Sequence, residues 1–368
     1  MPQTQHLTHS YPPTHSLVII AGPTASGKSA LGIDLAKAIG GEIISADSVQ
    51  VYRGFDIGSG KLGVHEQMSI PHHLISILDP DEAFDAGRFS ELAWKAIGEI
   101  RGRKKIPIVV GGTGLYIEAL INGLANTPEV DSEKMQEFLE WEAQKIGATD
   151  SEDAYRQALF VELTERDPRF AQRLNPRDVS RVRRALMVHF ATGKSLGDYW
   201  QDQEESPSNV SAFVVAFLPD RQTLYRRIDA RVEQMFSDGF VEEVRGLRNC
   251  WGKQARGLGS IGYKQICQYL DGEIMSCESV GLIKRDTRRF AKRQYTWWRN
   301  RPAKLGWGQL QLSETPIVNT QPLAQEFISG EIISPRGLLT QIKSLIEKQN
   351  AELVPGVTCV CCPFIWGQ

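Results

Sequence analysis

LVIIAGPTASGKSALGIDLAKAI, residues 17–39, contains a short apolar run, a glycine-rich turn and a stretch whose apolar residues recur with helical spacing. This order predicts a strand over 17–21, a loop, and a helix over 29–39. GPTASGKS (22–29) matches the pattern GxxxxGK(S/T) in full, directly after the expected strand and directly before the expected helix. That context is typical of a P-loop, which binds phosphate groups.

The residue types of this loop suit a phosphate ligand. Gly22 and Gly27 allow the backbone to curl so that successive N–H groups and the helix N-terminus point at phosphate oxygens. Lys28 adds a cation, and the Ser29 hydroxyl offers a ligand to Mg²⁺, which is the cofactor that we expect. The candidate phosphate-binding residues are Gly22, Pro23, Thr24, Ala25, Ser26, Gly27, Lys28 and Ser29. An idle glycine-rich turn is the alternative.

Strand-like and helix-like segments alternate along the chain on both sides of a long interruption. Expected strands cover 42–45, 72–78 (the weakest), 106–110 and 209–217, and an amphipathic helix covers 89–100. This alternation predicts an α/β fold, in which a parallel sheet carries the P-loop and helices cover both faces. Because parallel strands end at the same edge, the loops that begin at Gly22, Ala46 and Gly111 should converge on the ligand.

The patterns also predict the organisation of the chain. We expect a disordered leader over 1–16, a catalytic core from 17–125 and 207–304, a helical insertion over 126–206, and an extension of unknown role over 305–368. The core should end in helices over 221–236, 240–249, 261–270 and 278–300. The extension should be irregular apart from one amphipathic helix over 338–348.

Composition excludes several classes of protein. The chain has 368 residues, of which 41% are hydrophobic and 23% charged, as in a soluble globular protein and unlike a fibrous or disordered one. Its apolar runs fall far short of the roughly 18 residues of a membrane span, and the first residues lack the features of a secretion signal. We therefore expect a cytoplasmic protein without a membrane partner. Six cysteines are too few for a disulfide scaffold, although the spacing of Cys359 and Cys362 leaves a metal site open.

Positive charge is concentrated in two segments. Residues 284–304 contain nine basic residues and one acid, and 166–184 contain seven arginines and two aspartates. Such segregation indicates a polyanionic partner, with solvated helix faces as the alternative. On a helix over 283–301, one stripe would carry Arg285, Arg289, Lys292 and Arg299, and the opposite side Ile283, Phe290 and Trp297. Tyr295 and Trp298 could stack on bases, with a place in the core as the alternative for aromatic residues at helical spacing, and Trp297 is expected in the core.

The expected strand IPIVV (106–110) runs into Gly111, Gly112 and Thr113 without a carboxylate. P-loop enzymes that transfer phosphoryl groups usually place an aspartate there to help hold the metal, so a kinase or ATPase is disfavoured. The carboxylate available at the ligand edge is Asp47, just after the expected strand over 42–45. A helix N-cap or turn role for this residue is the alternative.

Six motifs together resemble the tRNA dimethylallyltransferases, also called tRNA isopentenyltransferases. They are GPTASGKS (22–29), ISADSVQVYRGFDIGSGK (44–61), PHHLI (71–75), VVGGTGLYIEALINGL (109–124), SIGYKQ (260–265) and FAKRQYTWWR (290–299), in that order. The resemblance covers about residues 17–304. It implies a P-loop core with a helical insertion, and transfer of a dimethylallyl group from its diphosphate to N6 of adenosine 37 of tRNA. The implied partners are tRNA and dimethylallyl diphosphate, and we expect a monomer.

The resemblance also implies residue roles. Asp47 would be the general base, Thr113 would contact the acceptor nucleotide, and Arg231 would close over the diphosphate that the P-loop binds. Further tRNA contacts would come from Ser48, Val49, Gln50, Arg181, Arg183, Arg184, Lys264, Lys292 and Arg293. A helix N-cap for Thr113, a surface ion pair for Arg231 and an ordinary turn for Gln50 are the alternatives.

Three rival functions remain open. An adenylate isopentenyltransferase would use the same chemistry on a free nucleotide, while a metabolite kinase or a non-catalytic RNA-binding ATPase would use the P-loop differently. SGKLG (59–63) also departs from the sequence usual in the resembled family, which leaves the path of that loop open.

Overall fold

The computed structural model describes residues 17–63, 65–124, 127, 130–147, 151–204, 210, 212–304, 308–311 and 357–362. The leader expected over 1–16 and the helix expected over 338–348 lie outside these residues. The chain forms two compact units. Residues Gly123–Ser208 make up one of them, and the other contains the core, which is described first.

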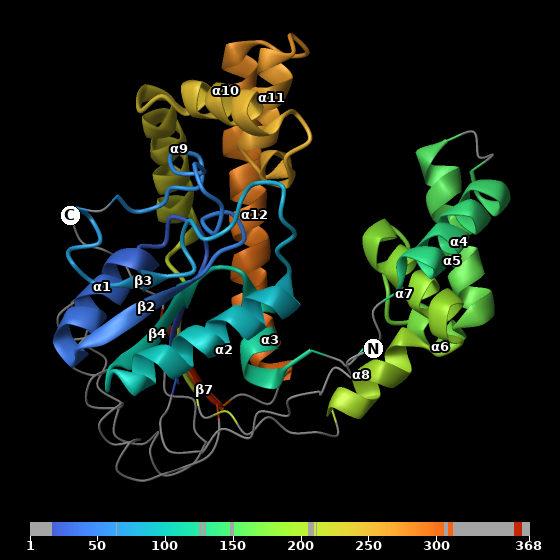
Figure 1. Ribbon diagram of the computed structural model, residues 1–368, viewed down its shortest axis with the longest axis horizontal. Coiled ribbons are helices and arrows are strands. Elements are labelled where there is room, and N and C mark those ends of the chain that lie inside the picture. Colours follow the sequence, from blue (N-terminus) through green and yellow to red (C-terminus); the bar gives the residue numbers. More distant parts are fainter. Residues whose placement is uncertain are drawn as a thin grey trace. The chain divides into compact units, whose positions relative to one another are not determined.

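The core contains a parallel sheet (Figure 1). Its described strands are β1 (Leu17–Ala21), β2 (Gly41–Ala46), β3 (His72–His73), β4 (Ile106–Gly111), β5 (Ala212–Phe217), β6 (Gly308–Gln311) and β7 (Val357–Cys362). They lie in the order β3-β2-β4-β1-β5-β7-β6. The strand β1 is therefore flanked by β4 and β5, with Ile19 paired to Val109 on one side and to Val214 on the other.

Helices cover both faces of the sheet. Alternate residues of β1 point to opposite faces because the side-chain period of a strand is two. Val18 and Ile20 pack with the helix α1 (Lys28–Ile39). Leu17 and Ile19 share a cluster with α2 (Ala86–Gly102), α3 (Gly114–Asn122) and part of α12 (Ser276–Lys304). The predicted fold class, a parallel sheet with helices on both faces, is confirmed.

The third strand is shorter than predicted. We expected a strand over 72–78, but β3 ends at His73. Leu74 and Ser76 have φ angles of 60° and 52°, in the left-handed region, which a strand cannot contain. The next residues pair with the loop after β2 instead: Ser76 and Ile77 donate backbone N–H groups to the carbonyls of Gln50 and Val51, and Leu78 forms an isolated bridge with Tyr52.

Helices expected near the end of the core are present. They are α9 (Arg221–Ser237), α10 (Phe240–Trp251), α11 (Tyr263–Leu270) and α12, with a short 3₁₀ helix over Arg256–Gly259. A third apolar cluster joins these helices to the loop after β2, through buried side chains such as Phe55, Phe240 and Tyr263. That cluster fixes the loop against α10 and α11.

The extension is less irregular than predicted, because both β6 and β7 lie within it. The backbone of β7 pairs in parallel with β5, for example Val214 with Cys359, and with β6 on its other side. VTCVCC is rich in β-branched residues and so suits a strand. The expectation of an irregular tail was wrong for this segment.

The second unit is helical in all its described secondary structure. It contains α4 (Ser132–Lys145), α5 (Glu152–Arg166), α6 (Pro168–Ala171), α7 (Val179–Thr192) and α8 (Leu196–Glu204). These helices share an apolar cluster of their own, which includes the buried side chains of Phe138, Leu163 and Leu186. Asp167 and Asp178, the two acids of the arginine-rich segment, are N-caps whose side chains accept backbone N–H groups.

None of the described helices is long and apolar enough to cross a membrane.

Candidate active site

The loop between β1 and α1 is tightly curled. Gly22, Ala25 and Gly27 have φ angles of 150°, 61° and 98°. A Cβ on Gly22 would lie 2.5 Å from the carbonyl oxygen of Phe217 in the neighbouring strand, so only glycine fits there. The partly buried Lys28 donates from Nζ to the carbonyl of Pro23 at 3.2 Å, which bends its ammonium group back over the loop.

Asp47 lies directly after β2. Its Oδ1 accepts hydrogen bonds from the backbone N–H groups of Val49 at 2.9 Å and Gln50 at 3.2 Å. Asp47 therefore has the turn role that was considered for it, but this role uses only one of its two carboxylate oxygens. No hydrogen bond from the described residues reaches the other oxygen, Oδ2.

Asp47, Lys28 and Arg231 interact electrostatically with one another. Burial lowers the pKa of Lys28 to about 8, while the charge of Asp47 opposes this shift and that of Arg231 adds to it. Burial likewise lowers the pKa of Arg231, again against the charge of Asp47. The loop after β2 and a residue of α9 thus meet the P-loop at the carboxyl edge of the sheet, as the convergence of the strands predicts.

Arg231 contacts both neighbouring loops. Its Nη1 donates to Oγ1 of Thr24 at 3.3 Å, and its Nη2 donates to the carbonyl of Ser59 at 3.1 Å. A Cβ on Gly60 would overlap the guanidinium group. The surface ion pair considered for Arg231 is not what the structure contains, because this side chain contacts the P-loop instead.

Two sets of hydrogen bonds, most of them partly buried, hold the chain over 56–61, which leads into the segment 59–63 whose path the sequence left open. Both carboxylate oxygens of Glu243, on α10, accept backbone N–H groups, from Asp56 at 3.1 Å, Ile57 at 2.6 Å and Gly58 at 3.1 Å. The buried Nζ of Lys61 bonds the carbonyl of Tyr52, Oδ1 of Asp56 and Oγ of Ser76. Sequence reasoning missed Glu243, because nothing local links a glutamate on α10 to a loop almost two hundred residues earlier.

The loop after β4 forms the third side of the site. Thr113 is partly buried, and its carbonyl accepts the N–H groups of Tyr116 and Ile117, so it begins the first turn of α3. Its neighbour Gly112 is joined to the P-loop by Gln294 of α12. The carboxamide of Gln294 donates from Nε2 to the carbonyl of Gly112 at 3.0 Å and accepts from the N–H of Thr24 at 2.9 Å. The motif FAKRQYTWWR (290–299) contains Gln294, but no pattern in it points to this contact.

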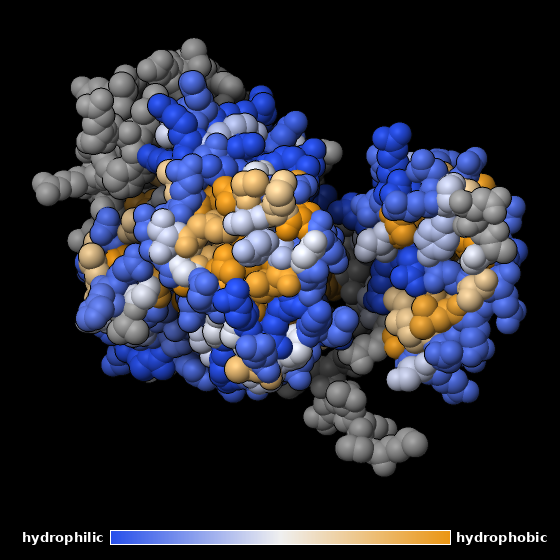
Figure 2. All heavy atoms as spheres, turned by 90° about the horizontal axis from the view of Figure 1, so that it is seen from above, coloured by the Kyte–Doolittle hydropathy of each residue, from blue (hydrophilic) through white to orange (hydrophobic). Residues whose placement is uncertain are grey.

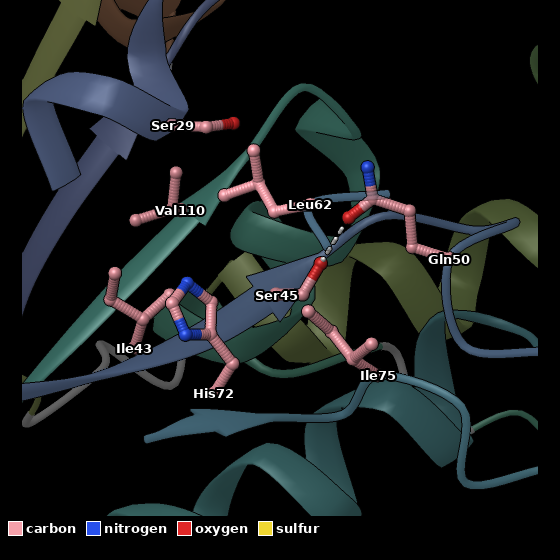
Figure 3. Close-up of a pocket in the computed structure, with 8 residues that line it drawn as sticks. All are labelled: Ser29, Ile43, Ser45, Gln50, Leu62, His72, Ile75 and Val110. Atoms are coloured by element: carbon pink, nitrogen blue, oxygen red, sulfur yellow. Dashed lines mark hydrogen bonds between the residues drawn. The ribbon is translucent and has the colours of Figure 1, made fainter. Parts of the chain in front are cut away.

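A small cavity of about 20 Å³ lies beside the P-loop (Figure 3). Its lining residues are Ser29, Ile43, Ser45, Gln50, Leu62, His72, Ile75 and Val110. Inside it, the hydroxyl of Ser45 points at the carboxamide of Gln50 and donates to it at 3.2 Å (Figure 3). This volume holds about one water molecule, so an organic substrate would bind outside the cavity, at the open edge between the three loops.

One hydroxyl at this edge is of the kind that can serve as a magnesium ligand beside phosphate oxygens. The described residues contain no group of three His, Cys, Asp or Glu side chains that could enclose a metal. Mg²⁺ usually keeps several waters and binds through one or two protein ligands together with phosphate oxygens. Ser29, at the start of α1, is the available hydroxyl.

Only part of the positive charge on α12 is free of ion pairs. Arg285 and Arg289 share Asp286, Arg288 pairs with Asp229, and Lys284 pairs with Glu233. Within the described residues, no ion pair involves Lys292, Arg293 or Arg299, and all three are exposed. The predicted basic stripe is therefore strongest in the last turns of the helix. Lys264, on α11, is also exposed.

The aromatic residues of α12 correct one prediction. We expected Trp297 in the core and considered Trp298 for stacking on bases, but Trp298 is fully buried in the cluster under the sheet. Trp297 is partly buried, and its ring lies against Gly114, where a Cβ would collide with it. The helix turns by about 100° per residue, so adjacent tryptophans cannot occupy equivalent positions.

The three candidate arginines of the second unit differ in their contacts. Arg183 forms a bidentate pair with Glu142, at 2.6 Å and 2.5 Å, and Tyr155 donates to the same carboxylate. Arg181 is exposed and pairs with its N-cap Asp178 at 3.3 Å. Arg184 is exposed, with one long hydrogen bond to Thr127 at 3.5 Å. Arg181 and Arg184 are thus accessible to a ligand, whereas Arg183 is bound to its own unit.

Comparison with known proteins shows which family has this arrangement. The family model described as IPP transferase matches residues 50–301. This chain belongs to the IPP transferase family. The model described as isopentenyl transferase matches residues 15–73 only.

Named relatives of this IPP transferase support the same family assignment. The chain is 46% identical over 288 residues to the tRNA dimethylallyltransferase of Geobacter sulfurreducens, covering 78% of this chain and 90% of the relative. It is 43% identical over 289 residues to that of Carboxydothermus hydrogenoformans, with the same coverage, 78% and 90%. The family predicted from the six motifs is confirmed.

Solved structures of similar proteins include two transferases of this kind. The tRNA isopentenylpyrophosphate transferase of Staphylococcus epidermidis matches with a TM-score of 0.59 and 33% identity, covering 91% of this chain and 99% of that one. A eukaryotic dimethylallyltransferase acting on tRNA matches with a TM-score of 0.64 and 28% identity, covering 77% of this chain and 69% of that one.

Proposed function

We propose that this IPP transferase moves a dimethylallyl group from dimethylallyl diphosphate to N6 of adenosine 37 in tRNA, and that it releases diphosphate. The named relatives and the structural neighbour that acts on tRNA support the reaction. The observation that carries the proposal is the position of Asp47 directly after β2, at the edge where Arg231 donates to Thr24 of the P-loop and where Asp47 interacts electrostatically with Lys28 and Arg231. It brings a carboxylate to the edge of a cationic phosphate cradle.

The reaction breaks the allylic carbon–oxygen bond. Its electron pair stays on the diphosphate oxygen, so negative charge grows on the leaving group while positive charge spreads over the allyl group. The N6 lone pair then forms the carbon–nitrogen bond. Donors that are already in place where charge develops stabilise the transition state without reorganising.

Lys28, Arg231 and the backbone of the P-loop are those donors. A guanidinium group can bond two phosphate oxygens at once, and Arg231 already donates to Thr24 within the P-loop. Mg²⁺ bound by Ser29 and the diphosphate would share the negative charge of the leaving group.

Asp47 removes the proton from N6 as the bond forms. The exocyclic amine is a weak nucleophile because its lone pair is delocalised into the purine, so a positioned base accelerates attack. Oδ1 holds the turn through Val49 and Gln50. The proton therefore goes to Oδ2. Thr113, in the facing loop, orients the amine through its hydroxyl.

Exposed cations of both units bind the tRNA backbone. Lys292 and Arg293 on α12, Lys264 on α11, and Arg181 and Arg184 on α7 supply phosphate contacts. Arg183 does not bind RNA itself but forms an ion pair with Glu142, which holds α7 against α4. Ser48, Val49 and Gln50 follow the base directly and face the target nucleotide, which must leave its stack to react.

The proposal is tested by incubating unmodified tRNA with dimethylallyl diphosphate and Mg²⁺, with and without the protein, and analysing the nucleosides by mass spectrometry. We expect a dimethylallyl adenosine at position 37 only when the protein is present. Product on AMP or ATP but not on tRNA would identify an adenylate isopentenyltransferase. Transfer of labelled γ-phosphate from ATP to an acceptor would identify a kinase.

A further inference from the structure

Gln294 is a buried carboxamide that connects two loops of the site. It is 8% exposed, and it lies on α12, far along the chain from both of its partners. Its Oε1 accepts from the N–H of Thr24 at 2.9 Å, and its Nε2 donates to the carbonyl of Gly112 at 3.0 Å. A carboxamide is the neutral side-chain group that offers a donor and an acceptor side by side.

The loop at Gly112 lies very close to the P-loop. A Cβ on Gly112 would collide with Nε2 of Gln294 and lie 2.9 Å from the carbonyl oxygen of Gly22. The two loops therefore touch here, with backbone against backbone, and Gln294 satisfies a donor on one and an acceptor on the other. A buried backbone group left without a partner is costly, so this amide determines how the loops approach.

The two loops carry the opposite halves of the reaction. Thr24 belongs to the cradle of the leaving group and accepts a hydrogen bond from Arg231. Gly112 precedes Thr113, which faces the acceptor. We propose that Gln294 is a positioning residue that sets the separation of the diphosphate cradle and the Thr113 loop, an inference that rests on the proposed function. A misplacement of about 1 Å between reacting groups can cost about a hundredfold in rate.

The test compares Gln294→Met and Gln294→Glu with wild type and with Thr296→Ala, an exposed neighbour on α12. Methionine keeps the volume but has neither the donor nor the acceptor. We expect the single-turnover rate of Gln294→Met to fall about tenfold to a hundredfold, with the Kd for tRNA within about twofold of wild type. Thr296→Ala should react at the wild-type rate.

The glutamate variant separates positioning from packing. A protonated carboxyl reproduces the amide, because its carbonyl accepts from Thr24 and its O–H donates to Gly112. The ionised form has no donor and repels the carbonyl of Gly112. Burial raises the pKa of such a carboxyl, so the rate of Gln294→Glu relative to wild type should rise as the pH falls from 8 to 6. The relative rate of Gln294→Met should stay flat.

Amide hydrogen exchange gives a readout that needs no activity. The N–H of Thr24 should exchange faster in Gln294→Met than in wild type, and it should stay protected in Gln294→Glu, whose carboxyl group accepts this N–H in both protonation states. A wild-type rate in Gln294→Met overturns the inference, and so does an equal, pH-independent loss in both variants. A wild-type protein that transfers no dimethylallyl group contradicts the proposed function instead, and the exchange result then still reports on the contact.

Discussion

Asp47 has two separable tasks, because its carboxylate oxygens have different surroundings. Oδ1 accepts two backbone N–H groups and so shapes the turn after β2. Oδ2 is left for the proton of the acceptor amine. A substitution that keeps an oxygen acceptor but removes basicity can therefore isolate the chemical task.

Asp47→Asn should reduce the single-turnover rate of prenyl transfer by about 10²- to 10⁴-fold, the usual contribution of a positioned base. The amide oxygen can still accept the N–H groups of Val49 and Gln50, so tRNA affinity and the thermal midpoint should change little. Asp47→Ala should show the same loss of rate and in addition about 1 kcal/mol less stability, since the acceptor is lost. A near-normal rate in Asp47→Asn would rule out this residue as the base.

The affinity of the P-loop for diphosphate should depend on pH, because Lys28 loses its charge as the pH rises. Its pKa is lowered by burial to about 8, so the ammonium form that attracts phosphate is complete below that pH and declines above it. The Kd for inorganic diphosphate should therefore rise above about pH 8, by up to about tenfold for each pH unit. Lys28→Arg stays charged throughout, so the ratio of the wild-type Kd to the Kd of Lys28→Arg separates the titration of Lys28 from that of the diphosphate and should rise above about pH 8. Titration calorimetry from pH 6.5 to 9.5 measures both, and a flat ratio would contradict the prediction.

At the scale of single elements, α12 combines two functions along its length. Its inner side buries Ile283, Ala291 and Trp298 and presents Gln294 to the site, while its outer side carries exposed cations. Neighbouring acids already neutralise the cations near its start. The exposed cations near its end are free to meet phosphates.

Lys292→Ala with Arg293→Ala should weaken tRNA binding more than Arg285→Ala, the matched control that already pairs with Asp286. Each lost phosphate contact should reduce the slope of log K against log salt by about one. Filter binding between 50 and 300 mM salt measures the slopes. Equal slopes in the double variant and in wild type would show that Lys292 and Arg293 do not contact the RNA backbone.

At the scale of the whole molecule, the core and the inserted unit have separate apolar interiors. Among the residues that the structure describes, the clusters around the sheet contain none of Gly123–Ser208, and the cluster of the inserted unit contains none of the core. Damage to one interior should therefore leave the other intact. This separation allows the contribution of each unit to binding to be measured.

Leu163→Ala removes a fully buried side chain from the inserted unit. It should destabilise that unit by about 2–5 kcal/mol, through the lost transfer energy and the cavity left behind. At a temperature where the unit is partly unfolded, tRNA affinity should fall while the Kd for diphosphate stays within about twofold of wild type. Parallel binding assays decide this, and an equal loss of both affinities would mean that the units do not act separately.

Local patterns were enough to predict much of this protein. The strand over 17–21, the P-loop and the helix after it follow from rules that act within a few residues, namely apolar periodicity and the need for glycine at tight turns. The same patterns predicted the parallel sheet. They also indicated that Asp47 would lie at its ligand edge, because strand ends and the loops after them can be read directly from the chain.

Tertiary structure alone decided the remaining contacts of the site. Gln294 meets Thr24 across 270 positions and Gly112 across 182, and Glu243 holds the loop at Ile57 from 186 positions away. No local rule selects such partners, because they depend on how α10 and α12 pack on the rest of the core. The burial of Trp298 and the pairing of β7 with β5 were misjudged for the same reason. Local patterns set which segments become helices and strands, whereas packing sets which side chains and strand edges meet.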